Sequence, residues 1–427
     1  NELSADQLAW PQKGRHGYDS GDHIRQHYHT WTPQEVRLQA AWSLMWTGVG
    51  YINNAIEAIE GVDPANADVT EEELAAIVAE SRVLSAYHYM KIMDLWGNVP
   101  IVTQVGIPEN PETQSREEVF SFVEQELLEN VENLSLLSPQ MLGRVSRAAG
   151  YAMLSELYLN AEVWSGEARW TEAAEYADRV IAGDGGALAG SIMLDQDPLG
   201  PFNNTNEDAP ENIFQFPYSP DNGFGYNWAG LFMGFSNMTA ALDVNYSGNN
   251  ALVVIPSAFD AYQDNDIRKE EWFLFGPQYK YGTTEPILGS EEYTGQPFVY
   301  VNSIRKNSEG QTGEGSMTEG EENSGARFNK YRSGTQDDEN YLENDFVIYR
   351  LTEMYFNKAE ALIRQNGGAA TSEAVALINE SKSRYFSEED WPSEMYTTAT
   401  LTLNELLAER GREFLSLIHI SEPTRPY

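Results

Sequence analysis

Cysteine is absent from this 427-residue sequence. The chain therefore has no disulfide bonds, no thiolate metal ligands and no cysteine nucleophile. Basic residues are scarce, since 27 Lys and Arg stand against 66 Asp and Glu, for a formal net charge of −39. A field of that sign repels phosphate backbones and anionic lipid surfaces, so the composition argues against nucleic-acid binding.

Long hydrophobic runs are also missing. No stretch approaches the roughly 18 consecutive apolar residues that a membrane-spanning helix needs. Hydrophobic residues still make up 41% of the chain and aromatic residues 12%, which is enough to form a core. Motifs of the GxSxG, HExxH, P-loop and dinucleotide-binding types are not found. A pair of carboxylates working as in glycosidases remains an alternative, because the sequence is rich in acids.

Helical periodicity dominates two stretches, 36–183 and 345–414. Apolar residues recur at helical spacing over 36–60, and Gly61 ends that run. Thr70 and Glu73 form a capping box that opens a second helix, which reaches about Trp96. We expect further helices at 116–136, from Ser146 through Tyr158, and at 170–181, 347–363, 372–385 and 403–414.

The middle of the chain, 184–344, has a different character. Gly, Asn, Pro and aromatic residues dominate it, and helical spacing is lost apart from a short run at 256–262. Residues 308–325 contain few apolar side chains, so we expect that segment to be mobile. A loop region of this length inside a compact chain is usually functional.

The helices occur in pairs joined by short breaks. The unit 147–182 has the spacing of a tetratricopeptide-type pair, with small and aromatic residues at the contact positions. The expected fold is therefore mainly α, with tetratricopeptide-like helix pairs as a scaffold and a long loop-rich insertion. Residues 1–414 are expected to form one domain, in which 1–35 is an N-terminal loop.

Residues 415–427 read LSLIHISEPTRPY. Through Arg425 this segment resembles a translated sequencing-adapter end. We expect these residues to be a non-native tail and the natural chain to continue differently after Phe414.

Five blocks in order resemble the SusD/RagB family. They are RVLSAYHYMKIMDLWGNVPIVT at 82–103, RAAGYAMLSELYL at 147–159, IYRLTEMYFNKAEA at 348–361, NESKSR at 379–384 and ELLAERGREF at 405–414. Together they span most of the chain, which makes the resemblance more specific than any single motif. The family segment that normally follows the last block is missing here.

The resemblance implies a function. SusD-like proteins are outer-membrane surface lipoproteins that bind glycans without cleaving them and deliver them to a SusC-like TonB-dependent transporter. It also implies a lipid-anchoring Cys upstream of Asn1. No cofactor and no catalytic residue is expected. The alternatives are a helical-repeat scaffold that binds a protein and, less favoured, a hydrolase acting on glycans.

The N-terminal segment 8–34 corresponds to the family region that supplies sugar contacts. Sugar rings stack their C–H faces on aromatic rings, and their hydroxyls pair with charged side chains. A second surface is expected in the loop-rich region 184–344, where Tyr226 and Trp228 stand among Gly and Asn. The candidate glycan-binding residues are Trp10, Arg15, Tyr18, Asp19, Asp22, Tyr28, Trp31, Tyr226 and Trp228.

Histidines are concentrated in the same N-terminal segment. His23, His27 and His29, together with Asp19 or Asp22, offer ligands to a transition metal. Their spacing fits no standard motif, so we predict no metal site. The acidic cluster around Asp264 lacks the ligand set of a calcium loop, and we expect Asp266 to pair with Arg268 instead.

Overall fold

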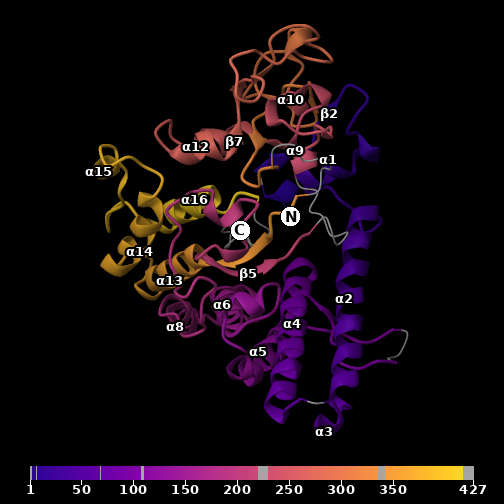
Figure 1. The fold of residues 1–427 in the computed structure, drawn as a ribbon, viewed down its shortest axis with the longest axis vertical. Coiled ribbons are helices and arrows are strands. Elements are labelled where there is room, and N and C mark those ends of the chain that lie inside the picture. The colour runs from indigo at the N-terminus through magenta and orange to yellow at the C-terminus, as the bar shows by residue number, and fades with distance from the viewer. Residues whose placement is uncertain are drawn as a thin grey trace.

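A computed structural model describes residues 2–5, 7–67, 69–106, 110–219, 229–334 and 342–416. Figure 1 shows long helices filling the lower and left parts of the molecule, and short helices, strands and loops filling the upper part. The long helices are α2 (Val36–Glu60), α4 (Glu71–Trp96), α5 (Arg116–Asn130), α6 (Arg147–Leu159), α8 (Trp170–Ile181), α13 (Leu351–Gln365), α14 (Ser372–Ser383) and α16 (Leu403–Glu413).

The helix ends follow local signals in the sequence. The Oγ1 atom of Thr70 accepts the Glu73 amide at 3.1 Å, and the Glu73 carboxylate accepts the Thr70 amide at 2.8 Å. Both halves of the predicted capping box are therefore formed at the start of α4. Helix α4 stops where Gly97 adopts a φ of 72°, a conformation that glycine reaches without a steric penalty.

Helices α6 and α8, which form the pair predicted for 147–182, pack against each other. The Ser155 hydroxyl of α6 donates to the Ala173 carbonyl of α8 at 3.0 Å, and the small side chains of Ala173 and Ala177 are fully buried. Small residues at the contact let the helix backbones approach closely. The fold is mainly helical as expected, while the tetratricopeptide-like character of the pairs stays a prediction.

One expected helix begins later than predicted. Residues 346–350 form strand β12 (Phe346–Arg350), which pairs antiparallel with β5 (Asn212–Phe216), and α13 starts only at Leu351. The side chains of this strand are buried on both faces, so its apolar residues follow one another without the alternation typical of a strand. Such a run cannot be told from a buried helix segment by its spacing. The prediction of a helix from residue 347 was wrong for this reason.

The helix predicted for 116–136 is also shorter. Helix α5 ends at Asn130, and a single 3₁₀ turn follows at Val131–Asn133. The backbone carbonyl of Ser135 instead accepts the amide of Arg147 at 2.8 Å. A long-range backbone contact thus competes with the last helical turns.

The remaining described elements of the chain are short. The short α-helices are α1 (Asp22–His27), α3 (Pro64–Ala67), α7 (Ala161–Ser165), α9 (Ala229–Phe232), α10 (Thr239–Leu242), α11 (Pro256–Asp260), α12 (Ile267–Glu271) and α15 (Trp391–Glu394). Single 3₁₀ turns lie at Glu2–Ser4, Asp19–Gly21, Pro139–Met141, Gly200–Phe202, Asn206–Asp208, Ser236–Met238 and Asn307–Glu309. The other paired strands are β1 (Leu8–Ala9) with β6 (Val253–Val254), β2 (Gln12–Lys13) with β10 (Glu319–Gly320), β3 (Val99–Pro100) with β4 (Thr113–Gln114), β7 (Phe273–Leu274) with β11 (Arg327–Phe328), and β8 (Gly276–Pro277) with β9 (Val299–Tyr300).

The segment 308–325 is ordered at its C-terminal end, which corrects the expectation that it is mobile throughout. Glu321 and Glu322 are buried. The Glu321 carboxylate accepts the Tyr293 hydroxyl at 2.6 Å, and the Glu322 carboxylate accepts the Ser290 and Tyr293 amides at 2.9 Å each. These two carboxylates hold the segment by accepting hydrogen bonds from a neighbouring loop. The prediction of mobility considered only the low apolar content and could not detect these polar contacts.

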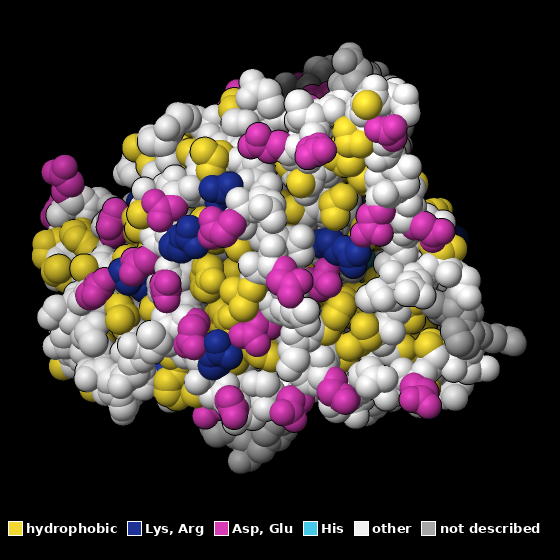
Figure 2. Space-filling view, turned by 90° about the horizontal axis from the view of Figure 1, so that it is seen from below, with side chains coloured by type: hydrophobic (Ala, Val, Ile, Leu, Met, Phe, Trp, Pro, Cys, Tyr) yellow, Lys and Arg dark blue, Asp and Glu magenta, His cyan; other side chains and the backbone are white. Residues whose placement is uncertain are grey.

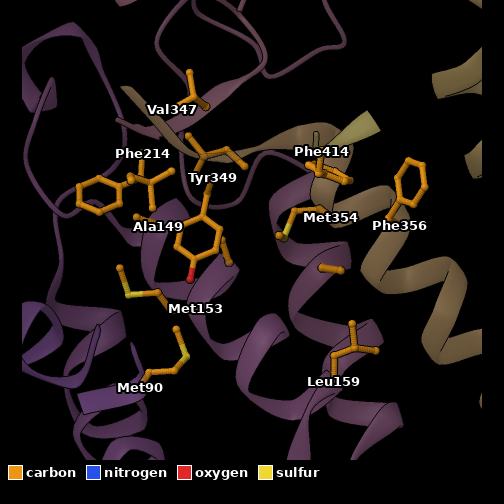
Figure 3. Packing of buried hydrophobic residues seen from close by; sticks show 14 of the residues in the cluster. Met90, Ala149, Met153, Leu159, Phe214, Val347, Tyr349, Met354, Phe356 and Phe414 are labelled. Carbon is orange, nitrogen blue, oxygen red and sulfur yellow. The ribbon is translucent and has the colours of Figure 1, made fainter. Parts of the chain in front are cut away.

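The main core joins helices to the strand pair. Figure 3 shows Tyr349 of β12 reaching toward Met153 of α6, with Phe214 and Met90 close by. The Tyr349 hydroxyl donates to the carboxylate of Glu156, which also accepts Lys91 at 2.7 Å. Burying this charged pair is tolerated because each polar atom finds a partner.

The packed chain extends to residue 416. Leu415 and Ser416 are buried, and Leu415 belongs to the main core. The rest of the expected non-native tail, 417–427, lies outside the described residues.

Acidic side chains are distributed over the surface. In Figure 2, which views the molecule from below, they are scattered over the whole face, and Lys and Arg form only a few isolated groups. Of the helices that the structure describes, none combines the length and the apolarity needed to cross a bilayer.

Candidate functional site

The N-terminal segment lies across the loop-rich part of the molecule and is held there by two short strands. Strand β1 pairs with β6, and β2 pairs in parallel with β10. Within β2, the buried Lys13 donates from Nζ to the carbonyls of Asn250 at 2.5 Å and Ala251 at 3.2 Å. Burial lowers the pKa of Lys13 well below its usual value, and Arg327 lowers it further. The two strand pairs and the Lys13 contacts therefore hold the backbone of the candidate site in place.

Trp10 is half-buried because His23 stacks on its ring. The two ring centroids are 3.8 Å apart and the planes differ by 7°. The carboxylate of Asp19 approaches His23 Nε2 to 3.3 Å and Arg37 to 3.7 Å. Burial and the nearby Arg37 lower the pKa of His23 to about 4 against the attraction of Asp19, so the imidazole is neutral at neutral pH.

Three predicted aromatic residues are open to solvent. Tyr18 is 55% exposed, Tyr28 is 49% exposed and Trp31 is 42% exposed. The Tyr28 hydroxyl donates to the Ser316 carbonyl, and the ring of His29 lies 5.2 Å from that of Trp31. These contacts orient the rings while leaving part of each available to a ligand.

Two of the three predicted polar residues, Arg15 and Asp22, are placed differently from each other. Arg15 is exposed, and its Nε lies 3.3 Å from the Nε2 atom of His16. Asp22 contacts Arg25 at 2.5 Å, and Arg25 in turn contacts Glu35 at 2.5 Å. The Asp22 carboxylate therefore stabilises the turn that precedes α2 and has less freedom to bind a sugar hydroxyl.

A hollow of about 330 Å³ brings two of the predicted residues together. Trp10 and Asp19 line it beside His16, and Phe235 with residues 248–251 closes the opposite side. Its volume falls within the range of small-molecule pockets. Phe235 is half-buried and faces this hollow, with its ring 5.2 Å from that of His16.

The remaining predictions concern two loop aromatic residues, a metal site and the pairing of Asp266. Tyr226 and Trp228 lie outside the described residues. The described histidines and acids of the N-terminal segment do not assemble into a cluster that would hold a metal ion. Asp266 pairs with the buried Arg268 at 2.7 Å, as expected.

Comparison with known proteins gives consistent matches. A family model described as "SusD family" matches residues 210–416, and one described as "Starch-binding associating with outer membrane" matches residues 10–159. The starch-binding protein SusD of Bacteroides thetaiotaomicron is 24% identical, and the alignment covers 97% of this chain and 73% of that protein. A SusD-like protein of Bacteroides ovatus is 23% identical over 90% of this chain and 64% of its own length.

Solved structures show the same fold. Surface glycan-binding protein A from Bacteroides thetaiotaomicron, in complex with laminarihexaose, superposes with a TM-score of 0.72 at 20% identity, covering 97% of this chain and 80% of that one. A laminarin-binding SusD-like protein has a TM-score of 0.70 at 19% identity, with 97% and 82% covered. Because the two family models together match most of the sequence in the expected order, the chain belongs to the SusD family.

Proposed function

We propose that this protein binds a neutral oligo- or polysaccharide at its N-terminal face without cleaving it. The observation that carries the proposal is the group of exposed rings, Tyr18, Tyr28 and Trp31, on the segment that also borders the hollow at Trp10. Its relatives include a starch-binding protein and a laminarin-binding protein.

The chemistry of these residues suits a sugar. Aromatic rings offer faces for the C–H surfaces of a pyranose, and Asp19 and Arg15 offer charged hydrogen-bond partners to hydroxyl groups. The net charge of −39 disfavours densely anionic polymers, so neutral glycans are the preferred class.

A binding role without catalysis is favoured by the lining of the hollow. A glycosidase needs two carboxyl groups about 5 to 9.5 Å apart around the scissile bond. Among the described residues that line this hollow, Asp19 is the single acid, and it faces His23 and Arg37.

The family associates with the outer membrane, and the chain as a member is an outer-membrane-associated protein. We propose further that it is exposed at the cell surface on an N-terminal lipid anchor and delivers its glycan to a SusC-like TonB-dependent transporter. Co-purification with such a transporter expressed from the same cell tests this step. A protein that never associates with the transporter under conditions where it binds glycan would contradict delivery.

Affinity gel electrophoresis against a panel of polysaccharides, with a reducing-sugar assay on the same mixtures, tests the binding itself. Retardation by one polymer without new reducing ends is the expected result. New reducing ends would contradict the non-catalytic role, and migration unaffected by every polymer would contradict glycan binding.

A further inference from the structure

A second hollow lies along α2, apart from the N-terminal face. It has a volume of about 620 Å³ and runs between the middle of α2 and the connection from β3 to β4. Figure 1 shows the described residues of this connection beside α2, well below the N-terminal segment. We call it the α2 groove. Its described lining residues are Trp42, Trp46, Val49, Gly50, Asn53, Asn54, Pro100, Val102, Gln104, Val105, Gly106, Asn110 and Pro111.

None of these described lining residues is charged. That is unusual in a chain where 22% of residues are charged and the net charge is −39. A solvated helix face normally carries charges, so an open groove whose described lining carries none favours a ligand that is itself uncharged.

The lining combines two kinds of side chain. Trp42, Trp46, Pro100 and Val105 supply apolar surface, and the amides of Asn54, Gln104 and Asn110 supply hydrogen-bond donors and acceptors. Trp42 is 36% exposed and Val105 is 47% exposed, so both present surface to solvent. Flat apolar surface beside neutral amides matches a pyranose, which has an apolar face and a rim of hydroxyl groups.

The aromatic floor is held in place. The ring of Trp42 stands 5.1 Å from Trp96 at 83° and 5.4 Å from Trp46 at 56°. Trp46 in turn packs edge-on against Tyr89 at 5.9 Å. A ring fixed on two sides loses little freedom when a ligand stacks on it.

The opposite wall is tied to the same helices. The amide of Asn53 in α2 donates to the carbonyl of Val102 at 2.9 Å. The hydroxyl of Tyr89 in α4 donates to that same carbonyl at 2.9 Å and accepts the Val102 amide at 2.7 Å. The groove therefore has rigid walls at its base.

We propose that the α2 groove is a second binding site for a neutral oligosaccharide, separate from the N-terminal face. The inference rests on the proposed glycan-binding function and extends it to a second ligand position. A chain with two sites holds a polymer by two contacts, and tethering raises the apparent affinity for polymers above that for short oligosaccharides.

Gly50 gives a clean way to block the groove. A Cβ atom built at Gly50 meets nothing within 4 Å, so a larger side chain fits there without displacing the fold. Gly50→Gln fills the groove and replaces a glycine inside a helix, which does not weaken α2. The matched control is Tyr51→Gln, since Tyr51 is 73% exposed on α2 and does not line the groove.

The test is isothermal titration of the full chain with laminarihexaose and with maltohexaose. We expect two bound molecules per wild-type chain for the hexasaccharide that binds, one in Gly50→Gln and two in Tyr51→Gln. Trp42→Ala should weaken the second site by about tenfold. Trp31→Ala should instead weaken the other site and leave the α2 groove occupied.

Three results would overturn the proposal. The first is one bound hexasaccharide per chain in both the wild type and Gly50→Gln. That result would be consistent with binding at the N-terminal face and would show that the α2 groove binds no glycan. Another is unchanged glycan binding by Gly50→Gln together with loss of transporter co-purification, which assigns the groove to a protein partner. The third is a wild-type chain that binds neither hexasaccharide, which contradicts the proposed function as well as the groove.

Discussion

Arg350 and Glu413, which are 63 residues apart in the sequence, meet in the core with 2.6 Å between Nη2 and Oε1. Both side chains are buried. Arg268 approaches the other carboxylate oxygen of Glu413 to 3.1 Å, and Arg350 also contacts Glu211 at 2.6 Å. This cluster joins the last helix α16 to strand β12 and to the loop-rich part of the chain.

Removing one charge from this cluster should be costly. Glu413→Ala leaves Arg350 and Arg268 buried without their shared partner, and we expect the free energy of unfolding to fall by about 3–5 kcal/mol. Chemical denaturation followed by circular dichroism measures the change. Glu373→Ala is the control, because Glu373 is 56% exposed in its contact with Lys358 and should cost no more than about 1 kcal/mol. Equal losses in the two variants would contradict the role given to the buried cluster.

The same cluster predicts acid sensitivity. Burial favours the protonated form of Glu413, but Arg350, Arg268 and Arg384 outweigh it and lower its pKa to about 2. Arg268 and Arg412 outweigh burial in the same way and lower the pKa of Glu409 to about 2. Because both values lie below the ordinary 4.5, the stabilisation is complete above pH 4.5 and is lost as pH falls toward 2. The melting temperature should fall steeply as the pH is lowered from 4.5 to 2. A melting temperature that does not change over this range would contradict the lowered pKa values of Glu413 and Glu409.

Glu353 predicts the opposite pH dependence. Burial and the neighbouring Glu156 raise its pKa to about 8, although Arg410 lies 3.7 Å away. The unfolded chain loses this proton near pH 4.5 while the folded chain keeps it, so the contribution to stability decreases as pH rises from 4.5 to 8. We expect Glu353→Gln, which mimics the protonated carboxyl, to gain melting temperature relative to the wild type between pH 5 and pH 9. A difference that stays constant over that range would show that Glu353 is ionised in the folded chain.

Two tryptophans of the N-terminal segment should respond differently to removal. Trp31→Ala removes an exposed ring, so we expect a loss of about 1–3 kcal/mol in glycan affinity with an unchanged melting temperature. Trp10→Ala also removes the ring that stacks on His23 at 3.8 Å, so stability should fall by about 2 kcal/mol or more as well. Affinity electrophoresis and thermal melts on both variants separate the two effects. Wild-type affinity in both folded variants would remove the N-terminal segment from the site.

Much of the helical scaffold could be read directly from the sequence. Helices α2 and α8 begin and end where periodicity and breaking residues predict, and the capping box at Thr70 and Glu73 forms as expected. These features depend on hydrogen bonds and side-chain spacing within a few residues. The five blocks of family resemblance were likewise local, and the family assignment they indicated is confirmed.

The candidate site was only partly predictable. Composition and resemblance pointed to Tyr18, Tyr28 and Trp31, and these rings are exposed. Nothing local to Asp22 revealed that Arg25 and Glu35 would engage its carboxylate. The α2 groove was missed because Trp42 and Trp46 occupy helical positions that also suit a core.

The sequence by itself determined the helical scaffold, the acidic charge and the family of this protein. Helix spacing and family motifs depend on residues that are close in the sequence, and the net charge is the sum over the charged residues. Tertiary structure alone decided that residues 346–350 form a strand, since β5 pairs with them from more than a hundred positions away. It also decided which aromatic residues face solvent. Burial depends on what packs against a side chain, and those partners come from distant parts of the chain.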